Sequence, residues 1–141
     1  SAATLPVTMD CVKKNIGVKS EVVSFVLPIG ATVNMDGTSL YQAMAVIFLA
    51  QFHMIDLTIS DQVLIVLTAT LASIGSAAVP SAGLIMLMIV LSAVDLNPAW
   101  IAIILPMDRI LDMCRTVVNV TGDTSVATVI ASSEDGFVDV E

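Results

Sequence analysis

Long apolar runs, broken at intervals by short clusters of small and polar residues, are the main feature of the sequence. Residues 62–94 carry no charge, and as one straight helix they would be about 50 Å long against a bilayer core of about 30 Å. The middle of this run, 73–83, is rich in Gly, Pro and Ser, which break helices. A re-entrant hairpin with arms at 62–74 and 84–94 is therefore predicted, with its turn sheltered by protein or by a water-filled cavity.

Two further long segments flank this hairpin. In residues 22–52 a proline and a glycine precede a polar cluster at 34–38, so an interrupted helix is predicted there. Residues 98–132 are predicted to form one long helix with a kink at Pro106. Asn97 comes directly before the proline that would open this helix, which is the pattern of a helix N-cap.

The composition narrows the class of protein. Hydrophobic residues make up 57% of the chain and charged residues 13%, and the mean hydropathy is +0.97. Soluble domains carry about 25% charged residues. This excludes a disordered chain, a nucleic-acid binder and an ordinary water-soluble fold, and it indicates a membrane protein. The net charge of −8 reflects a few acids in the C-terminal tail and others set in apolar sequence, so it does not predict an electrostatically steered partner.

The few basic residues predict an orientation in the membrane. Lys13, Lys14 and Lys19 precede the first span, so this end is expected in the cytoplasm. The loop at 53–61 has no Lys or Arg and would lie outside, and the acidic tail would be cytoplasmic. The chain opens on Ser without a charged and apolar leader, so no signal peptide is predicted. We expect it to be the C-terminal piece of a longer, multi-pass protein of the inner or plasma membrane.

The last predicted helix carries a row of polar side chains. Five of them follow one another at steps of four, three, four and four: Asp108, Asp112, Arg115, Asn119 and Asp123. At about 100° per residue they fall within about 80° of one another around the helix. Lipid would penalise each charge by several kcal/mol, so this polar stripe must face protein, water or a ligand. Some alternatives need no ligand. Asp112 could form an ion pair with Arg115, and Asp108 could pair with Arg109 or lie at the membrane interface. Asp123 could lie near the cytoplasmic end and be solvated.

The interrupted segments suit a charged ligand. Broken helices expose carbonyl groups and helix ends at mid-membrane, and these stabilise a desolvated Na⁺ or an anionic group. Asn34, Asp36 and Thr38 add the hard oxygen donors that alkali cations prefer. In the alternative, Asp36 caps the second half-helix, a role compatible with ion binding. Common metalloprotease, hydrolase and P-loop motifs are absent from the sequence, and an enzyme is not expected.

Three motifs occur together. The first is Asn34-Met35-Asp36-Gly37-Thr38, the second is the hairpin tip at 73–80, and the third joins residues 112–116 to residues 119–123. Together they resemble the glutamate/aspartate transporter family (dicarboxylate/amino acid:cation symporters), in a prokaryotic-type member. The resemblance extends to about residue 132. It implies an all-α membrane protein, the C-terminal part of an inverted-repeat transport domain with an interrupted helix, a re-entrant helical hairpin and a long final transmembrane helix.

The resemblance also implies a role for each segment. Residues 1–21 would be the second arm of a first re-entrant hairpin and a cytoplasmic loop, 22–52 the interrupted transmembrane helix, 53–96 an extracellular loop and the second hairpin, 97–132 the final transmembrane helix and 133–141 the acidic cytoplasmic tail. Residues 75–83 would be the extracellular gate. The implied partners are the missing N-terminal helices of the same protein, the lipid bilayer, two further copies in a homotrimer, an acidic amino acid and Na⁺, and no nucleic acid.

Ligand-binding residues are implied in the same way. Asp112 would hold the substrate ammonium, Arg115 its side-chain carboxylate and Asn119 its α-carboxylate. Thr38, Thr116 and the backbone around Ser1 and Val79 would complete the implied substrate site. One sodium site would use Asp123 with backbone oxygens of Gly30, Asn34 and Asn119. A second would use backbone oxygens of Thr32, Ser73, Ile74 and Ser76, with Met35 nearby. A third would use the side chains of Asn34 and Asp36 together with upstream residues.

Two positions bear on what is transported. The family's dicarboxylate branch generally lacks the Asp and its neutral amino-acid branch lacks the Arg, so the presence of both Asp112 and Arg115 favours glutamate or aspartate. Gln42 stands where proton-coupled members tend to carry Glu, which favours Na⁺ coupling, although H⁺ coupling stays open. The expected mechanism is symport by alternating access. Two other classes stay open: an ion channel or proton-relay subunit that conducts along the acidic stripe, and a structural membrane fragment.

Overall fold

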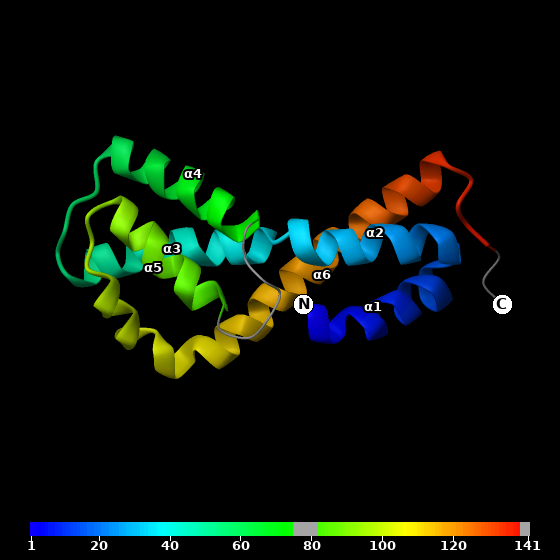
Figure 1. The fold of residues 1–141 in the computed structure, drawn as a ribbon, viewed down its shortest axis with the longest axis horizontal. Coiled ribbons are helices and arrows are strands. Elements are labelled where there is room, and N and C mark those ends of the chain that lie inside the picture. The colour runs from blue at the N-terminus through cyan, green and yellow to red at the C-terminus, as the bar shows by residue number, and fades with distance from the viewer. Residues whose placement is uncertain (75–81, 139–141) are drawn as a thin grey trace.

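The computed structural model describes residues 1–74 and 82–138, and this part of the chain is built from helices, so the predicted all-α class is confirmed for it (Figure 1). The α-helices are α1 (Leu5–Cys11), α2 (Ser20–Val33), α3 (Asp36–Phe52), α4 (Ile59–Ile74), α5 (Ala82–Ala93) and α6 (Asp108–Ser133). Shorter elements are the 3₁₀ helices η1 (Ala2–Thr4), η3 (Pro98–Ile103) and η4 (Leu105–Met107) and the π-helical turn η2 (Val12–Ile16).

Helix α6 runs diagonally through an elongated molecule and is shared by two groups of helices (Figure 1). Helix α2 lies along its C-terminal half with α1 packed against α2, and α3, α4 and α5 lie towards its N-terminal half. Each group has its own apolar core. The α1–α2–α6 core is built around Val12, Val18, Val23, Leu27, Ala127 and Ala131, and the other around Val46, Leu49, Ile65, Ala69, Leu87 and Leu91. The small side chains of Ala127 and Ala131 let α2 approach α6 closely.

The predicted interrupted helix is present, with a shorter break than expected. Helix α2 ends at Val33, and Asn34 and Met35 have non-helical backbone angles before α3 begins. The proline inside α2, Pro28, does not end the helix. The alternative in which Asp36 caps α3 is wrong, because Met35 holds the N-cap position and Asp36 lies in the first helical turn. A carboxylate is also favoured in that turn by the helix dipole.

The two arms of the predicted hairpin are helices α4 and α5, which pack against each other and against α3. Helix α4 begins after a reciprocal cap, in which Thr58 N donates to Asp61 Oδ2 over 2.9 Å and Asp61 N donates to Thr58 Oγ1 over 3.2 Å. Such a capping box satisfies two backbone donors at the helix start. The expected tip at 75–81 lies outside the described residues.

The prediction of one long helix over 98–132 is wrong in its first third. Residues 98–107 form the two 3₁₀ helices, and α6 begins only at Asp108. Pro106 has no backbone N–H and its ring disfavours the α conformation of the residue before it, so a regular helix cannot pass through this point without a break. The predicted N-cap is confirmed, since Asn97 Oδ1 accepts from Ala99 N over 3.0 Å.

Within residues 1–74 and 82–138, no helix combines the length and the apolar composition needed to cross a membrane.

Aromatic rings join the end of α3 to η3. His53 follows the last residue of α3, and its Nδ1 donates to Leu49 O over 2.9 Å, since a carbonyl oxygen can only accept. The imidazole ring stacks on the indole of Trp100, with centroids 3.6 Å apart and an interplanar angle of 10°. His53 therefore fixes η3 against α3 by packing.

Candidate functional site

The polar stripe of α6 lies where that helix passes the break between α2 and α3 (Figure 1). Four of its five members are at most 5% exposed: Asp108, Arg115, Asn119 and Asp123. The fifth, Asp112, keeps 38% of its side chain exposed. The predicted common face is thus confirmed, and it is turned inward against neighbouring helices. Buried groups of this kind are costly unless each is paired, so their partners define the site.

Asn119 joins three segments that are far apart in sequence. Its Oδ1 accepts from Gly37 N over 2.8 Å at the start of α3. Its Nδ2 donates to Ser1 Oγ over 3.2 Å and to Thr38 Oγ1 over 3.4 Å. Three residues expected at the substrate site, Ser1, Thr38 and Asn119, are therefore brought together. Thr116, one turn earlier on α6, is half-buried and donates through Oγ1 to Asp112 O over 3.0 Å.

Gly37 is the point of closest approach between α3 and α6. A Cβ added there would lie 2.5 Å from Arg115 O and 2.9 Å from Val118 Cβ. Because the first of these contacts is helical backbone, it cannot move aside cheaply. We expect Gly37→Ala to destabilise the folded protein by about 1–3 kcal/mol, measured as a lower thermal unfolding midpoint of the purified protein. Ser39→Ala, on the same helix, is the control, and equal midpoints for both variants would contradict this contact.

The guanidinium of Arg115 is held by two carboxylates. Its Nη2 donates to Asp108 Oδ1 over 3.1 Å and to Asp112 Oδ1 over 2.9 Å. Its Cζ lies 4.3 Å from the centroid of the Tyr41 ring, a cation–π distance. A Cβ on Gly83, at the start of α5, would collide with Arg115 Nη1. Helices α3, α5 and α6 therefore all help to position this one cation.

Both ion-pair alternatives for the stripe can now be judged. The prediction of an ion pair between Asp108 and Arg109 is wrong. Asp108 instead bonds Arg115, and the exposed Arg109 makes no ion pair with residues 1–74 or 82–138. The pair between Asp112 and Arg115 does form. It is not a closed, dry contact, however, because Asp112 is partly exposed and the buried Arg115 Nε has no hydrogen-bond partner in the described part of the chain. The group retains the capacity to bind a further ligand.

A second polar cluster lies at the break itself. Asn34 Nδ2 donates to Asp123 Oδ1 over 2.9 Å. Gly30 lies against the same oxygen, since a Cβ on it would collide with Asp123 Oδ1. A Cβ on Gly122 would lie 2.7 Å from Asn34 Nδ2 and 3.5 Å from Asp36 Oδ2. Residues expected for two of the sodium sites are therefore neighbours here, with two carboxylates and an amide oxygen in reach, the hard donors that suit an alkali cation.

Residues expected at the other sodium site are brought together in part. A cavity of about 410 Å³ between α3 and α4 is lined by Met35, Asp36, Ser39, Thr70, Ser73 and Ile74, among others. Thr32, which was expected to contribute its backbone oxygen, does not line this cavity. The expected ligands Ser76 and Val79 lie outside the described residues.

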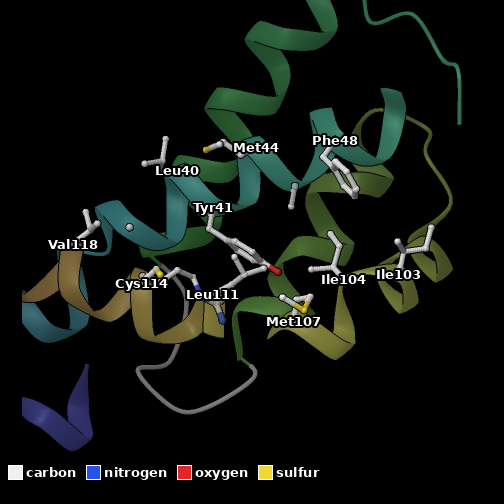
Figure 2. A pocket seen from close by; sticks show the side chains of 13 residues that line it. Leu40, Tyr41, Met44, Phe48, Ile103, Ile104, Met107, Leu111, Cys114 and Val118 are labelled. Atoms are coloured by element: carbon white, nitrogen blue, oxygen red, sulfur yellow. The ribbon is translucent and has the colours of Figure 1, made fainter. Parts of the chain in front are cut away.

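An apolar groove has Arg115 among its lining residues (Figure 2). It has a volume of about 550 Å³ and is formed by α3, α6 and the 3₁₀ segments between α5 and α6. Tyr41 reaches into it from α3, and Leu111 faces it from α6. Apolar walls exclude water and lower the local dielectric, which strengthens the attraction between Arg115 and any carboxylate that binds it.

Several contributors to the site were not assigned to it from the sequence. Gly37 and Asp108 belong to recognisable patterns, the first motif and the polar stripe, but neither was given a ligand-binding or positioning role. Asp108 and Arg115 are seven residues apart, which is about two helical turns, so their pairing could have been expected. Tyr41 and Gly83 act through tertiary contacts that carry no local signal.

Comparison with known proteins shows the family of this chain. The model of the sodium:dicarboxylate symporter family matches residues 1–133. An excitatory amino acid transporter of Caenorhabditis elegans is 50% identical over 130 residues, which cover 92% of this chain and 26% of that protein. Human excitatory amino acid transporter 2 is 48% identical over 130 residues, covering 92% of this chain and 23% of that protein. Human excitatory amino acid transporter 3 is 52% identical over 123 residues, which cover 87% of this chain and 24% of that protein.

The chain belongs to the sodium:dicarboxylate symporter family, which is a family of transporters and not of enzymes. The family resemblance found in the three motifs is thereby confirmed. The chain spans about a quarter of the length of the curated relatives it matches. The relatives named above are animal proteins, and the prokaryotic-type assignment stays a prediction.

Proposed function

We propose that the protein containing this chain couples the movement of Na⁺ to the uptake of an acidic amino acid, glutamate or aspartate, by alternating access. This chain is its substrate- and ion-binding C-terminal portion. The observation that carries the proposal is the pairing of Arg115 with a partly exposed Asp112 while Arg115 Nε keeps no partner. The relatives' names, excitatory amino acid transporters, point the same way.

The substrate binds by breaking the ion pair between Asp112 and Arg115 and pairing with each of the two side chains. Its ammonium takes the place of the guanidinium beside Asp112, and its side-chain carboxylate occupies the edge of Arg115 that is thereby released. A guanidinium binds a carboxylate in a two-bond fork, which favours an acidic substrate over a neutral one. The α-carboxylate lies at Asn119, with Ser1, Thr38, Thr116 and Val79 around it. Each charged group of the substrate thus has a charged or hydrogen-bonding partner in the loaded site.

Bound Na⁺ lowers the free-energy cost of moving the loaded site through the membrane, because it neutralises carboxylates. Asp36 and Asp123 would otherwise cross an apolar barrier as uncompensated charges. One Na⁺ lies at Asp123 with Gly30, Asn34 and Asn119, a second at Thr32, Met35, Ser73, Ile74 and Ser76, and a third at Asn34 and Asp36 with residues upstream of this chain. The polar cluster at the α2–α3 break supports the first and third of these sites.

The remaining parts of the proposal concern the membrane. Helices α4 and α5 are the arms of a re-entrant hairpin, and the segment between them is the extracellular gate. Residues 1–21 close a first hairpin, and the C-terminal residues lie in the cytoplasm. The upstream helices of the same protein cover the apolar faces of this portion, and the complete protein is a homotrimer in the inner or plasma membrane.

Coupling proceeds without a proton at Gln42. This side chain is fully buried in α3, and neither its Nε2 nor its Oε1 has a partner in the described part of the chain. We expect Gln42→Glu to make uptake depend on pH, with higher rates at lower pH. Burial disfavours a charged carboxylate, so a glutamate at this position must bind a proton before the site can close. Initial uptake rates across a pH series give the measurement.

The matched control for this variant is Gln51→Glu, which places the same side chain at the exposed end of α3. Its pH profile is expected to equal that of the parent. Superimposable profiles for Gln42→Glu and the parent would contradict a protonation step at this position.

The function itself is tested by transport. The purified full-length protein in liposomes is expected to accumulate labelled aspartate or glutamate under an inward Na⁺ gradient, and not when choline replaces Na⁺. Na⁺ and substrate together should also raise its thermal unfolding midpoint, since a ligand at 100 times its Kd stabilises by about 2.7 kcal/mol. A current without substrate accumulation would indicate a channel. Absence of uptake, current and ligand stabilisation would indicate a structural role.

A further inference from the structure

The chain beyond α6 forms a contact that the proposed transport mechanism does not use. We propose that residues 134–138, called the clasp below, bind residues 17–19, which follow α1 and η2. By holding this end of the α1–η2 segment, the clasp keeps Ser1, at the opposite end, aligned with Asn119 at the substrate site. The expected effect of the clasp on substrate affinity rests on the proposed function. The anchoring of α1 by the clasp does not, and it can be measured separately by amide hydrogen exchange.

The clasp is held to a segment distant in sequence by backbone hydrogen bonds. Lys19 N donates to Gly136 O and Val138 N donates to Gly17 O, both over 2.7 Å, around the antiparallel bridge between Val18 and Phe137. Lys19 Nζ also donates to Asp135 O over 2.6 Å. Three bonds between residues more than 100 positions apart hold the C-terminal segment against the connection that leads from η2 to α2.

Two glycines make this contact possible. Gly17 ends η2 with a φ of 80°, a left-handed conformation that side chains with a Cβ rarely adopt. Gly136 is buried, and its N donates to Ala131 O over 2.7 Å. A Cβ on Gly136 would lie 2.9 Å from Ala131 Cα and 3.1 Å from Val22 Cγ2. The clasp therefore packs into a gap between α6 and α2 that admits no side chain.

The same contact closes the core that holds α1. Val12 and Val18 are at most 2% exposed and pack with Val23 of α2 and Ala131 of α6. Val18 lies inside the bridge itself, so loosening the clasp would expose this core from its end. Helix α1 and η2 are thus attached to α2 and α6 by the clasp and the core together.

Helix α1 connects the clasp to the substrate site. Helix α1 rises by about 1.5 Å per residue and the π-helical turn η2 by less, so the clasp lies about 16 Å from the start of α1. At that start, Ser1 Oγ accepts from Asn119 Nδ2 over 3.2 Å. A tilt of about 10° at the clasp would move Ser1 by about 3 Å, which is enough to break a single hydrogen bond. Residues 134–138 are therefore a positioning segment for Ser1.

Gly136→Val in the full-length protein tests this directly. We expect the variant to raise the KM for aspartate about five-fold, the loss of one hydrogen bond, with kcat changed much less. A double-mutant cycle with Ser1→Ala separates positioning from general damage. If the clasp acts through Ser1, the double variant should have the same KM as Ser1→Ala alone. Additive effects would overturn the link to Ser1.

Val138→Pro provides a second variant that introduces no clash in a buried gap. It removes the N–H that donates to Gly17 O and fixes φ at position 138, at a residue that is 50% exposed. Val138→Ala keeps this N–H and is the matched control. Amide hydrogen exchange in residues 5–16 should be faster in Val138→Pro and Gly136→Val than in the control. Unchanged exchange in both would overturn the clasp, whereas absence of transport by the parent protein would contradict only the proposed function.

Discussion

Uptake of acidic amino acids is expected to fall at least about 30-fold when Arg115 is replaced by alanine in the full-length protein. The guanidinium is 5% exposed and is shared by Asp108 and Asp112. Its removal deletes the group that binds the substrate carboxylate and leaves a buried Asp108 without its cation. Truncating one partner of a buried charge pair costs about 2–5 kcal/mol, which corresponds to an affinity loss of about 30-fold to several thousand-fold. Labelled aspartate uptake measures the effect.

Folding and substrate choice have to be separated in this experiment. Arg109→Ala, six residues earlier on α6, removes an exposed arginine without an ion pair in the described part of the chain and should transport normally. Arg115→Ala should also retain Na⁺-dependent binding of a small neutral amino acid, because the ammonium partner Asp112 remains. Aspartate uptake at the parental rate would refute the assignment of Arg115.

Asp123→Asn is expected to weaken Na⁺ binding at least about tenfold. Two unit charges about 4 Å apart attract by about 4 kcal/mol at an effective dielectric constant of 20, and a third of that energy is already a tenfold change. The amide can still accept from Asn34 Nδ2, and it has nearly the same size beside Gly30, so the local packing should survive. The measurement is the Na⁺ concentration that gives half-maximal aspartate uptake.

The control for this substitution is Asp95→Asn. Asp95 follows α5 with a φ of 56°, a left-handed conformation that asparagine tolerates as well as aspartate does. Asp95→Asn removes the same charge at a distance from the α2–α3 break. The Na⁺ dependence of uptake by this variant should therefore match that of the parent. If Asp123→Asn behaved in the same way as Asp95→Asn, Asp123 would not be a sodium ligand.

Side-chain periodicity predicted the parts of the fold and site that depend on one helix. The steps between Asp108 and Asp123 place those residues on one face of α6, and burial confirms that face. The cluster at residues 34–38 predicted a break, and α2 and α3 do separate there. Both features follow from backbone geometry, which acts locally and can be read from spacing alone.

Features that depend on tertiary contacts could not be predicted in this way. Arg109 is the nearest arginine to Asp108 in sequence, yet the two point about 100° apart, and Arg115 returns to the same face two turns later. The start of α6 at Asp108 depends on how Pro106 and the preceding 3₁₀ turns pack. The pairing of Val18 with Phe137 joins segments separated by most of the chain, and neither carries a strand pattern.

The stacking of His53 on Trp100 provides an optical probe of the molecule's motion. Trp100 is the single tryptophan of this chain, and its indole lies between the end of α3 and the segment that leads into α6. Any movement that draws these two segments apart must separate the rings and transfer the indole to a different environment. In a background free of other tryptophans, the emission of Trp100 would therefore report whether Na⁺ or substrate changes the spacing between them.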